Sequence, residues 1–121
     1  MKPKIKSIRS FIGAKDYQVS RNFYAKWGFR EIVTSPKMSY FSDDVFGFYL
    51  QDYFIKEWVD NTMLFMEVSN LSDYWEILKG KNLDQKFEGV KLVEPTTFDW
   101  GSEGFVYDPS GILWHIGEFN K

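Results

Sequence analysis

Few side chains in this sequence can act as nucleophiles or as metal ligands. The 121 residues include no cysteine and a single histidine, His115. Without cysteine there is no disulfide framework, no thiolate nucleophile and no thiolate-based zinc or iron–sulfur site, which suits a reducing cytoplasm. One histidine also excludes sites that take two or three histidines from one chain, such as the H-E-x-x-H zinc site or the two-histidine facial triad.

His115 is the first candidate for a polar group in a binding cavity. It stands between Trp114 and Ile116, and alternate side chains of a strand point to opposite faces. Trp114 and Ile116 are expected to face the helices, so that His115 faces inward, where it could hydrogen-bond a ligand or act as a general base. The alternative is a partly buried histidine whose hydrogen bonds are all made by neighbouring strands.

Arg9 is the second candidate. Its alternation with Ile8 and Ile12 points it into the cavity if those isoleucines pack beneath a helix. A buried guanidinium needs an anionic or hydrogen-bonding counterpart. A ligand carboxylate and an internal residue such as Glu67 are the two counterparts that the sequence leaves open.

The first half of the chain has the pattern of one strand, one helix and three further strands. Alternation from Lys2 to Ile12 predicts the first strand. Asp16 is the expected N-cap, and Gly28 the expected C-cap, of a helix with a buried aromatic stripe. Turn residues separate three short runs that predict antiparallel strands at 29–34, 37–42 and 45–51, and the mixed segment 52–61 is expected to connect the halves.

The second half repeats this order of elements. A strand is expected at 62–68, followed by a helix that is capped by Asn70 and closed by Gly80. After a polar loop, strands are expected at 89–94, 104–107 and 112–119, with a type I turn at 108–111. The fold class is therefore α+β. Two βαβββ modules, about 1–55 and about 60–121, are expected to form a single domain over 1–121, an open, curved mixed sheet around a concave cavity with the helices outside.

The composition argues against two kinds of partner. The sequence has 15 Lys and Arg against 17 Asp and Glu, a formal charge of −2. The chain therefore lacks the positive electrostatic field that attracts nucleic acid. The longest apolar stretch, 45–50, is too short to span a membrane, and the N-terminus lacks the apolar segment of a signal peptide. We expect a cytoplasmic protein that binds neither nucleic acid nor membrane.

Two motifs resemble a known family. Asp16 with Phe23-Tyr24 and Trp27-Gly28-Phe29 is similar to a D…FY…LGF stretch, and the segment from Asp108 to Trp114 is similar to a closing DPxGxxx hairpin. Both belong to the glyoxalase/bleomycin-resistance/dioxygenase group, also called the vicinal oxygen chelate superfamily. The resemblance covers almost the whole chain and implies paired βαβββ modules around a cavity that is often completed by a second subunit.

The resemblance also implies four positions for metal ligands, which are His or Glu in metal-dependent members. They fall at Arg9, near Gln51, near Met63 and at His115. A guanidinium cannot coordinate a cation, an amide is a poor ligand, and a thioether is too soft for Mg²⁺, Mn²⁺ or Fe²⁺. Glu67, on the same face as Met63, could add one oxygen, which is still too few. We therefore expect no metal and no cofactor. This expectation argues against glyoxalase I or extradiol dioxygenase chemistry.

Aromatic side chains make up 20% of the sequence and fall into two groups. Those at helical spacing are expected in the core: Phe23, Tyr24, Trp27 and Trp75. The others either share the inward parity of the ligand positions or lie in irregular segments, where binding residues concentrate. This second group, expected to line a pocket or a dimer interface, is Phe11, Tyr49, Phe65, Trp58 and Trp100.

Together these features predict a metal-independent, bleomycin-resistance-like protein that binds a small aromatic or amphipathic molecule, such as a drug or antibiotic, as a homodimer. The expected ligand-binding residues are Arg9, Phe11, Tyr49, Gln51, Trp58, Met63, Phe65, Glu67, Trp100 and His115, and none is expected to be catalytic. One alternative is a lyase, isomerase or dioxygenase that uses a divalent metal. Another is an accessory domain whose own side chains fill the cavity.

Overall fold

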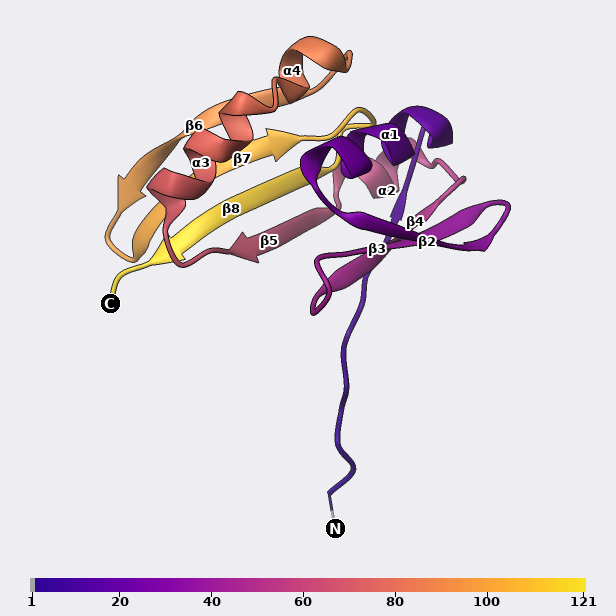
Figure 1. The fold of residues 1–121 in the computed structure, drawn as a ribbon, viewed down its shortest axis with the longest axis horizontal. Helices are drawn as coiled ribbons and strands as arrows, with labels where there is room; N and C mark the ends of the chain where they lie inside the picture. Colours follow the sequence, from indigo (N-terminus) through magenta and orange to yellow (C-terminus); the bar gives the residue numbers. More distant parts are fainter. Residues whose placement is uncertain (1) are drawn as a thin grey trace.

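Two open four-stranded sheets form the framework of the computed structural model, which describes residues 2–121 (Figure 1). The first sheet, in the order β1-β4-β3-β2, contains β1 (Phe11–Gly13), β2 (Arg30–Ser35), β3 (Met38–Ser42) and β4 (Gly47–Gln51). The second, in the order β5-β8-β7-β6, contains β5 (Met63–Glu67), β6 (Lys91–Phe98), β7 (Gly101–Tyr107) and β8 (Leu113–Phe119). In each half, the first strand along the chain pairs in parallel with the last: β1 with β4, and β5 with β8. The other neighbouring strands are antiparallel. The two halves therefore share one topology, and the predicted α+β fold class is confirmed.

Two longer helices cover one face of each sheet. They are α1 (Tyr17–Trp27) and α3 (Leu71–Gly80), accompanied by the short α2 (Lys56–Asp60) and α4 (Leu83–Lys86). The predicted caps are present, because Asp16 accepts a hydrogen bond from the Val19 N–H and Asn70 accepts one from the Asp73 N–H. Among residues 2–121, no helix combines the length and the apolar character that a membrane span requires.

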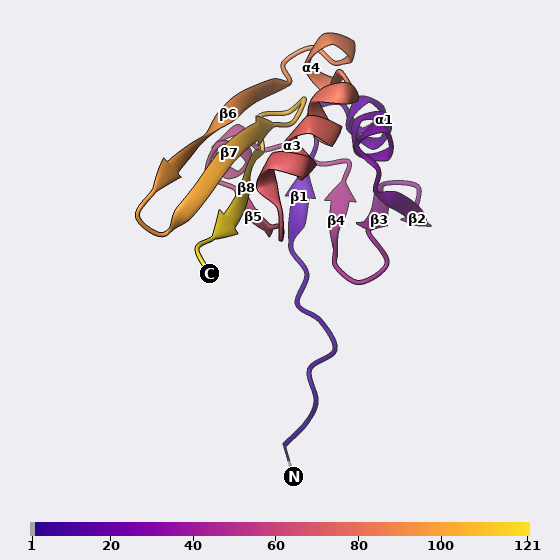
Figure 2. The same cartoon turned by 60° about the vertical axis from the view of Figure 1, so that its left-hand side comes forward.

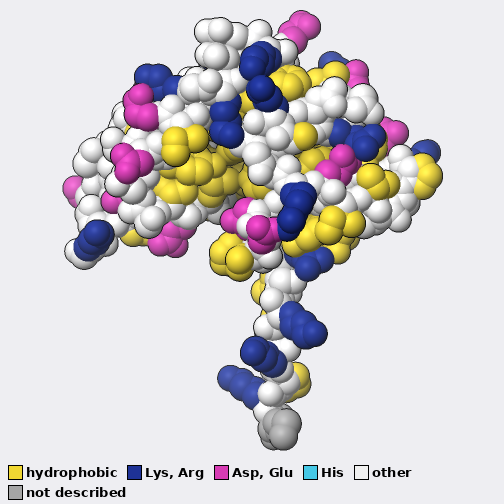
Figure 3. Space-filling view, viewed as in Figure 1, with side chains coloured by type: hydrophobic (Ala, Val, Ile, Leu, Met, Phe, Trp, Pro, Cys, Tyr) yellow, Lys and Arg dark blue, Asp and Glu magenta, His cyan; other side chains and the backbone are white. Residues whose placement is uncertain are grey.

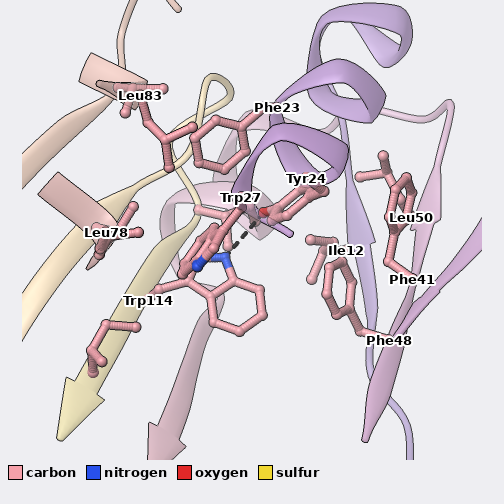
Figure 4. Close-up of a cluster of buried hydrophobic side chains, with 14 of the residues drawn as sticks. Ile12, Phe23, Tyr24, Trp27, Phe41, Phe48, Leu50, Leu78, Leu83 and Trp114 are labelled. Atoms are coloured by element: carbon pink, nitrogen blue, oxygen red, sulfur yellow. Dashed lines mark hydrogen bonds between the residues drawn. The ribbon is translucent and has the colours of Figure 1, made fainter. Parts of the chain in front are cut away.

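One aromatic core joins the two halves. The predicted stripe of α1 is buried, with Phe23, Tyr24 and Trp27 no more than 3% exposed. Rings of both halves meet there: Tyr24 and Trp27 contact Trp114 of β8 (Figure 4). The Trp27 indole also donates to the Tyr74 hydroxyl of α3 at 2.8 Å. Figure 2 shows α1 and α3 close together above the two sheets. The opposite face of each sheet, which we call the helix-free face, carries no helix from this core.

The first predicted strand is largely absent. Residues 2–10 form an extended arm that leaves the body (Figure 1), and only Phe11–Gly13 pair with β4. The expectation that Ile8 packs under a helix is wrong, since its side chain is 88% exposed, whereas Ile12 is buried at 1%. The reason lies in β4, which pairs with β1 only from Tyr49 onward and begins at Gly47, leaving the arm little strand to follow.

Three other boundaries differ from the prediction. The connector 52–61 contains α2, and the polar loop after α3 contains α4. The hairpin of β6 and β7 is longer than expected, because Pro95 does not end β6 at Glu94. The pairing shifts between Val93 and Thr96, and β6 is an edge strand, so the missing N–H of Pro95 costs no ladder hydrogen bond.

Candidate functional site

Cross-strand pairing places the predicted site residues of the strands on the helix-free faces. In β4, Phe48 and Leu50 are buried toward the core, and Tyr49 between them is only half-buried. In β8, Trp114 and Ile116 are buried toward the core, as predicted, and His115 points to the other face. The registers then bring Tyr49 beside Phe11 and His115 beside Phe65. Each helix-free face carries its own cluster of these residues.

On the first sheet, Arg9 lies over two tyrosines. One of its guanidinium nitrogens donates to the Tyr49 hydroxyl at 2.9 Å, and its central carbon lies 4.2 Å from the centroid of the Tyr40 ring. Phe11 stacks on Tyr49 with 4.7 Å between ring centroids and 19° between planes. We call Arg9, Phe11, Tyr40 and Tyr49 the Arg9 cluster. Gln51 follows on the same face, opposite Met38 and Gly13.

On the second sheet, His115 is held between Glu103 and Met63. Its Nδ1 lies 2.5 Å from Oε1 of Glu103, and its Nε2 lies 3.3 Å from the Met63 sulfur. Because a carboxylate only accepts, Glu103 orients the ring with Nδ1 as the donor and directs Nε2 toward Met63 and the open side. The Glu103 side chain is 12% exposed, and the rings of Phe65 and Phe105 flank the imidazole. These five residues are the His115 cluster.

A row of exposed rings continues from this cluster. Phe65 stacks on Phe119 at 5.5 Å, Trp100 lies 5.3 Å from Phe119, and Phe98 lies parallel to Trp100 at 5.8 Å. We call these four residues the aromatic row. Their exposed fractions range from 38% to 48%. Exposed rings grouped in this way are typical of interaction surfaces.

A crevice of about 960 Å³ opens between the two halves, largely on the helix-bearing side of β5, and Phe65 is the residue of the aromatic row that lines it. Two of the predicted site residues, Phe65 and Glu67, line it. Figure 3 shows hydrophobic side chains gathered in a hollow near the middle of the molecule. The other apolar side chains of the lining are Trp27, Phe29, Phe46, Phe48, Leu64, Met66, Val68, Ile77, Leu78 and Trp114.

Two of the sequence expectations place residues together that the structure keeps apart. Arg9 lies on the N-terminal arm over the first sheet and Glu67 lies in β5 of the second, and within residues 2–121 the guanidinium of Arg9 makes no ion pair with Glu67. Trp58 lies on α2, 62% exposed, with its ring 5.9 Å from Tyr53. Among the described residues no aromatic contact joins it to either cluster.

Five residues of this surface are not among those predicted from the sequence: Tyr40, Phe98, Glu103, Phe105 and Phe119. Parity contained a signal for Phe119, which stands four residues after His115 in β8 and therefore on the same face. The roles of Tyr40 and Glu103 could be predicted only with knowledge of the hairpin registers. Only the strand pairing shows that Tyr40 faces Tyr49 and that Glu103 lies diagonal to His115. Phe98 lies beyond the predicted end of its strand at residue 94, because β6 continues to Phe98.

The four positions at which the resemblance implies metal ligands do not come together as a metal site within residues 2–121. Arg9 of the N-terminal arm and Gln51 of β4 lie at the first sheet, while Met63 and His115 belong to the second. His115 has one carboxylate beside it, Glu103, and no three His, Asp or Glu side chains of residues 2–121 gather closely enough to hold an ion. The donor set of a guanidinium, an amide, a thioether and one imidazole does not fit a hard divalent cation.

The fold is that of bleomycin-binding proteins. The chain superimposes on a copper(II)-bleomycin complex of the bleomycin-binding protein from Streptomyces verticillus with a TM-score of 0.80, 17% identity and coverage of 99% of this chain and all of that one. An antibiotic binding protein from a Streptomyces species gives 0.74 at 16% identity, covering 98% and 100%. A glyoxalase-related enzyme from Fulvimarina pelagi gives 0.65 at 17%, covering 94% and 88%. The sequence matches no family model and no curated protein. The fold implied by the sequence resemblance is thus confirmed.

Proposed function

We propose that this protein binds a small organic ligand, such as an antibiotic, without a metal, as a homodimer in the cytoplasm. The observation that carries the proposal is the aromatic row beside His115. Four rings exposed on one helix-free face offer a flat apolar surface, and a planar or amphipathic molecule would cover it.

Two further features support ligand binding at or next to this face. The ring of His115 is fixed by Glu103, so its Nε2 offers one directed polar contact beside the apolar surface. The crevice shares Phe65 with the aromatic row, and its volume of about 960 Å³ lies within the range of small-molecule sites, roughly 300 to 1,000 Å³. Bleomycin-binding proteins of the same fold form complexes with bleomycin and with copper(II)-bleomycin.

Bleomycin and a panel of planar antibiotics test the proposal by thermal unfolding. A ligand at about 100 times its Kd stabilises the folded state by about 2.7 kcal/mol, so at least one compound is expected to raise Tm by roughly 10 °C. Phe119→Ala, which removes a ring from the aromatic row, is expected to reduce that shift by at least half. Val45→Ala, an exposed apolar residue outside the row and the crevice lining, should leave it unchanged.

Two results would contradict this proposal. One is the absence of any Tm shift across the whole panel. The other is stoichiometric Zn, Ni, Mn or Fe in protein purified without a histidine tag, lost on His115→Ala, which would establish the metal-dependent alternative.

The homodimer is proposed because the uncovered apolar surface extends beyond one small ligand. Met63 is 63% exposed and Ile32 is 56% exposed on the helix-free faces, and Ile5 and Ile8 are exposed along the arm. A second copy that covers a helix-free face would remove these side chains from water.

Sedimentation velocity is expected to give twice the mass of the chain. Ile32→Asp, which puts a charge on the helix-free face of the first sheet, should shift the protein to monomer. Val33→Asp is the matched control, since Val33 is its neighbour in β2, 59% exposed, and points to the opposite face. A wild-type monomer at micromolar concentration, or equal dissociation by both variants, would exclude this interface.

A further inference from the structure

Arg9 differs from the other arginines in its charge balance. Arg21 pairs with Glu31 at 2.7 Å, and Arg30 pairs with Asp44. Among residues 2–121, no carboxylate forms an ion pair with Arg9, whose hydrogen-bond acceptor is the neutral hydroxyl of Tyr49. A full positive charge therefore stands on the helix-free face of the first sheet without an anionic counterpart.

The position of this guanidinium is fixed by the rings beneath it. The Tyr40 ring lies 4.2 Å from the central carbon of Arg9, within the range of a cation–π contact. Tyr40 can lie there because residue 47 is a glycine: a Cβ at Gly47 would overlap the Tyr40 hydroxyl and lie 2.5 Å from its ring carbons. With the face of the guanidinium on Tyr40 and one N–H on Tyr49, its remaining N–H groups are available to another acceptor.

The surroundings supply the rest of a binding site. Tyr49 uses its oxygen to accept from Arg9, so its own proton remains free to donate. Phe11, 54% exposed, continues the flat surface of Tyr49 with which it stacks. The Gln51 amide lies two residues further along the same face of β4. Charged, hydrogen-bonding and planar apolar groups thus stand side by side.

We propose that the Arg9 cluster binds the carboxylate of a planar aromatic acid. The carboxylate takes the fork of the Arg9 guanidinium and the Tyr49 hydroxyl, and the attached ring lies against Phe11. This inference deepens the proposed function, on which it rests, by naming the chemical class of ligand group that the first sheet selects.

Calorimetric titration of the full-length protein with 2-naphthoate and with its neutral analogue 2-naphthamide tests the proposal. At pH 7 and low salt, naphthoate is expected to bind about tenfold more tightly than naphthamide, because a charge-assisted pair replaces a neutral one. Arg9→Gln should reduce this ratio to less than about twofold. Arg30→Gln is the matched control, since it removes the same charge from the same face but from an arginine already paired with Asp44, and it should keep the ratio.

Three outcomes would overturn the proposal. Equal affinities for the two compounds would show a site without preference for an anion, and a ratio that survives Arg9→Gln would place the anion elsewhere. If neither compound binds, the carboxylate site is excluded, while the proposed function still stands or falls by the antibiotic panel. Arg9 is exposed, and circular dichroism of Arg9→Gln checks that the fold is retained.

Discussion

Tyr24→Phe is expected to lower the free energy of unfolding by about 3 kcal/mol, although it removes a single oxygen atom. The Tyr24 hydroxyl donates to Oδ2 of Asp108 at 2.7 Å and accepts from the Trp114 indole at 3.0 Å. All three side chains are at most 4% exposed. The substitution therefore leaves a carboxylate oxygen and an indole N–H buried, and each unsatisfied group costs about 1 to 3 kcal/mol. Urea unfolding at pH 7 measures the loss.

Tyr74→Phe provides the matched control. Its hydroxyl accepts one indole N–H, from Trp27 at 2.8 Å, and is less buried than that of Tyr24. This control is expected to cost about 1 kcal/mol. A loss for Tyr24→Phe no greater than for Tyr74→Phe would contradict the account of the buried Asp108.

The pH dependence gives Tyr24→Phe a second signature. Burial raises the pKa of Asp108 above its ordinary value of 3.8, against the hydrogen bonds from Tyr24 and from backbone N–H groups, which lower it. A raised pKa in the folded state contributes stability below the ordinary pKa, and this contribution is lost as the pH rises through the folded value. Removal of the Tyr24 hydroxyl raises the pKa of Asp108 further. The destabilisation by Tyr24→Phe should therefore be larger at pH 7 than at pH 4.5.

The same contact explains why the fold could be predicted from the sequence. Tyr24 belongs to the first of the two motifs that marked the family resemblance, and Asp108 begins the second. Asp108 also accepts the backbone N–H groups of Ser110 and Ile112, which holds the turn before β8. The motifs are therefore parts of one buried hydrogen-bond network between the halves. Residues that hold a fold together in this way say little about its ligand.

Only those parts of the candidate site that follow from the alternation of side chains along a strand could be predicted from the sequence. Alternation placed Trp114 and Ile116 in the core and His115 on the opposite face, because the period of a strand is two residues wherever it pairs. Alternation does not give registers, so the Glu103 beside His115 and the Tyr40 beneath Arg9 emerged only from the pairing of β7 with β8 and of β3 with β4. Alternation also could not predict the residue at which β1 begins, because the pairing with β4 determines it.

Gly101→Ala is expected to be the most damaging small substitution, with a loss of about 3 kcal/mol or more. Gly101 has φ of 155°, and a Cβ there would overlap the Glu118 carbonyl oxygen and lie 3.0 Å from the Cα of Phe119. These atoms are backbone of β8, so no rotamer change relieves the overlap and the end of the β7–β8 ladder must open. Gly80→Ala is the control: nothing lies within 4 Å of its Cβ, and it should stabilise α3 by up to about 1 kcal/mol.

The same substitution links the sheet to the proposed site. Trp100 precedes Gly101 in the chain, and Phe119 is the ladder partner of Gly101. Opening this end of the sheet therefore displaces two rings of the aromatic row. Folded Gly101→Ala protein, assayed below its own melting range, should therefore lose the ligand-induced rise in Tm that Gly80→Ala retains. If Gly101→Ala unfolds at the wild-type urea concentration, β8 accommodates the methyl group. If it unfolds early but keeps the full ligand response, the aromatic row does not depend on the backbone of Gly101.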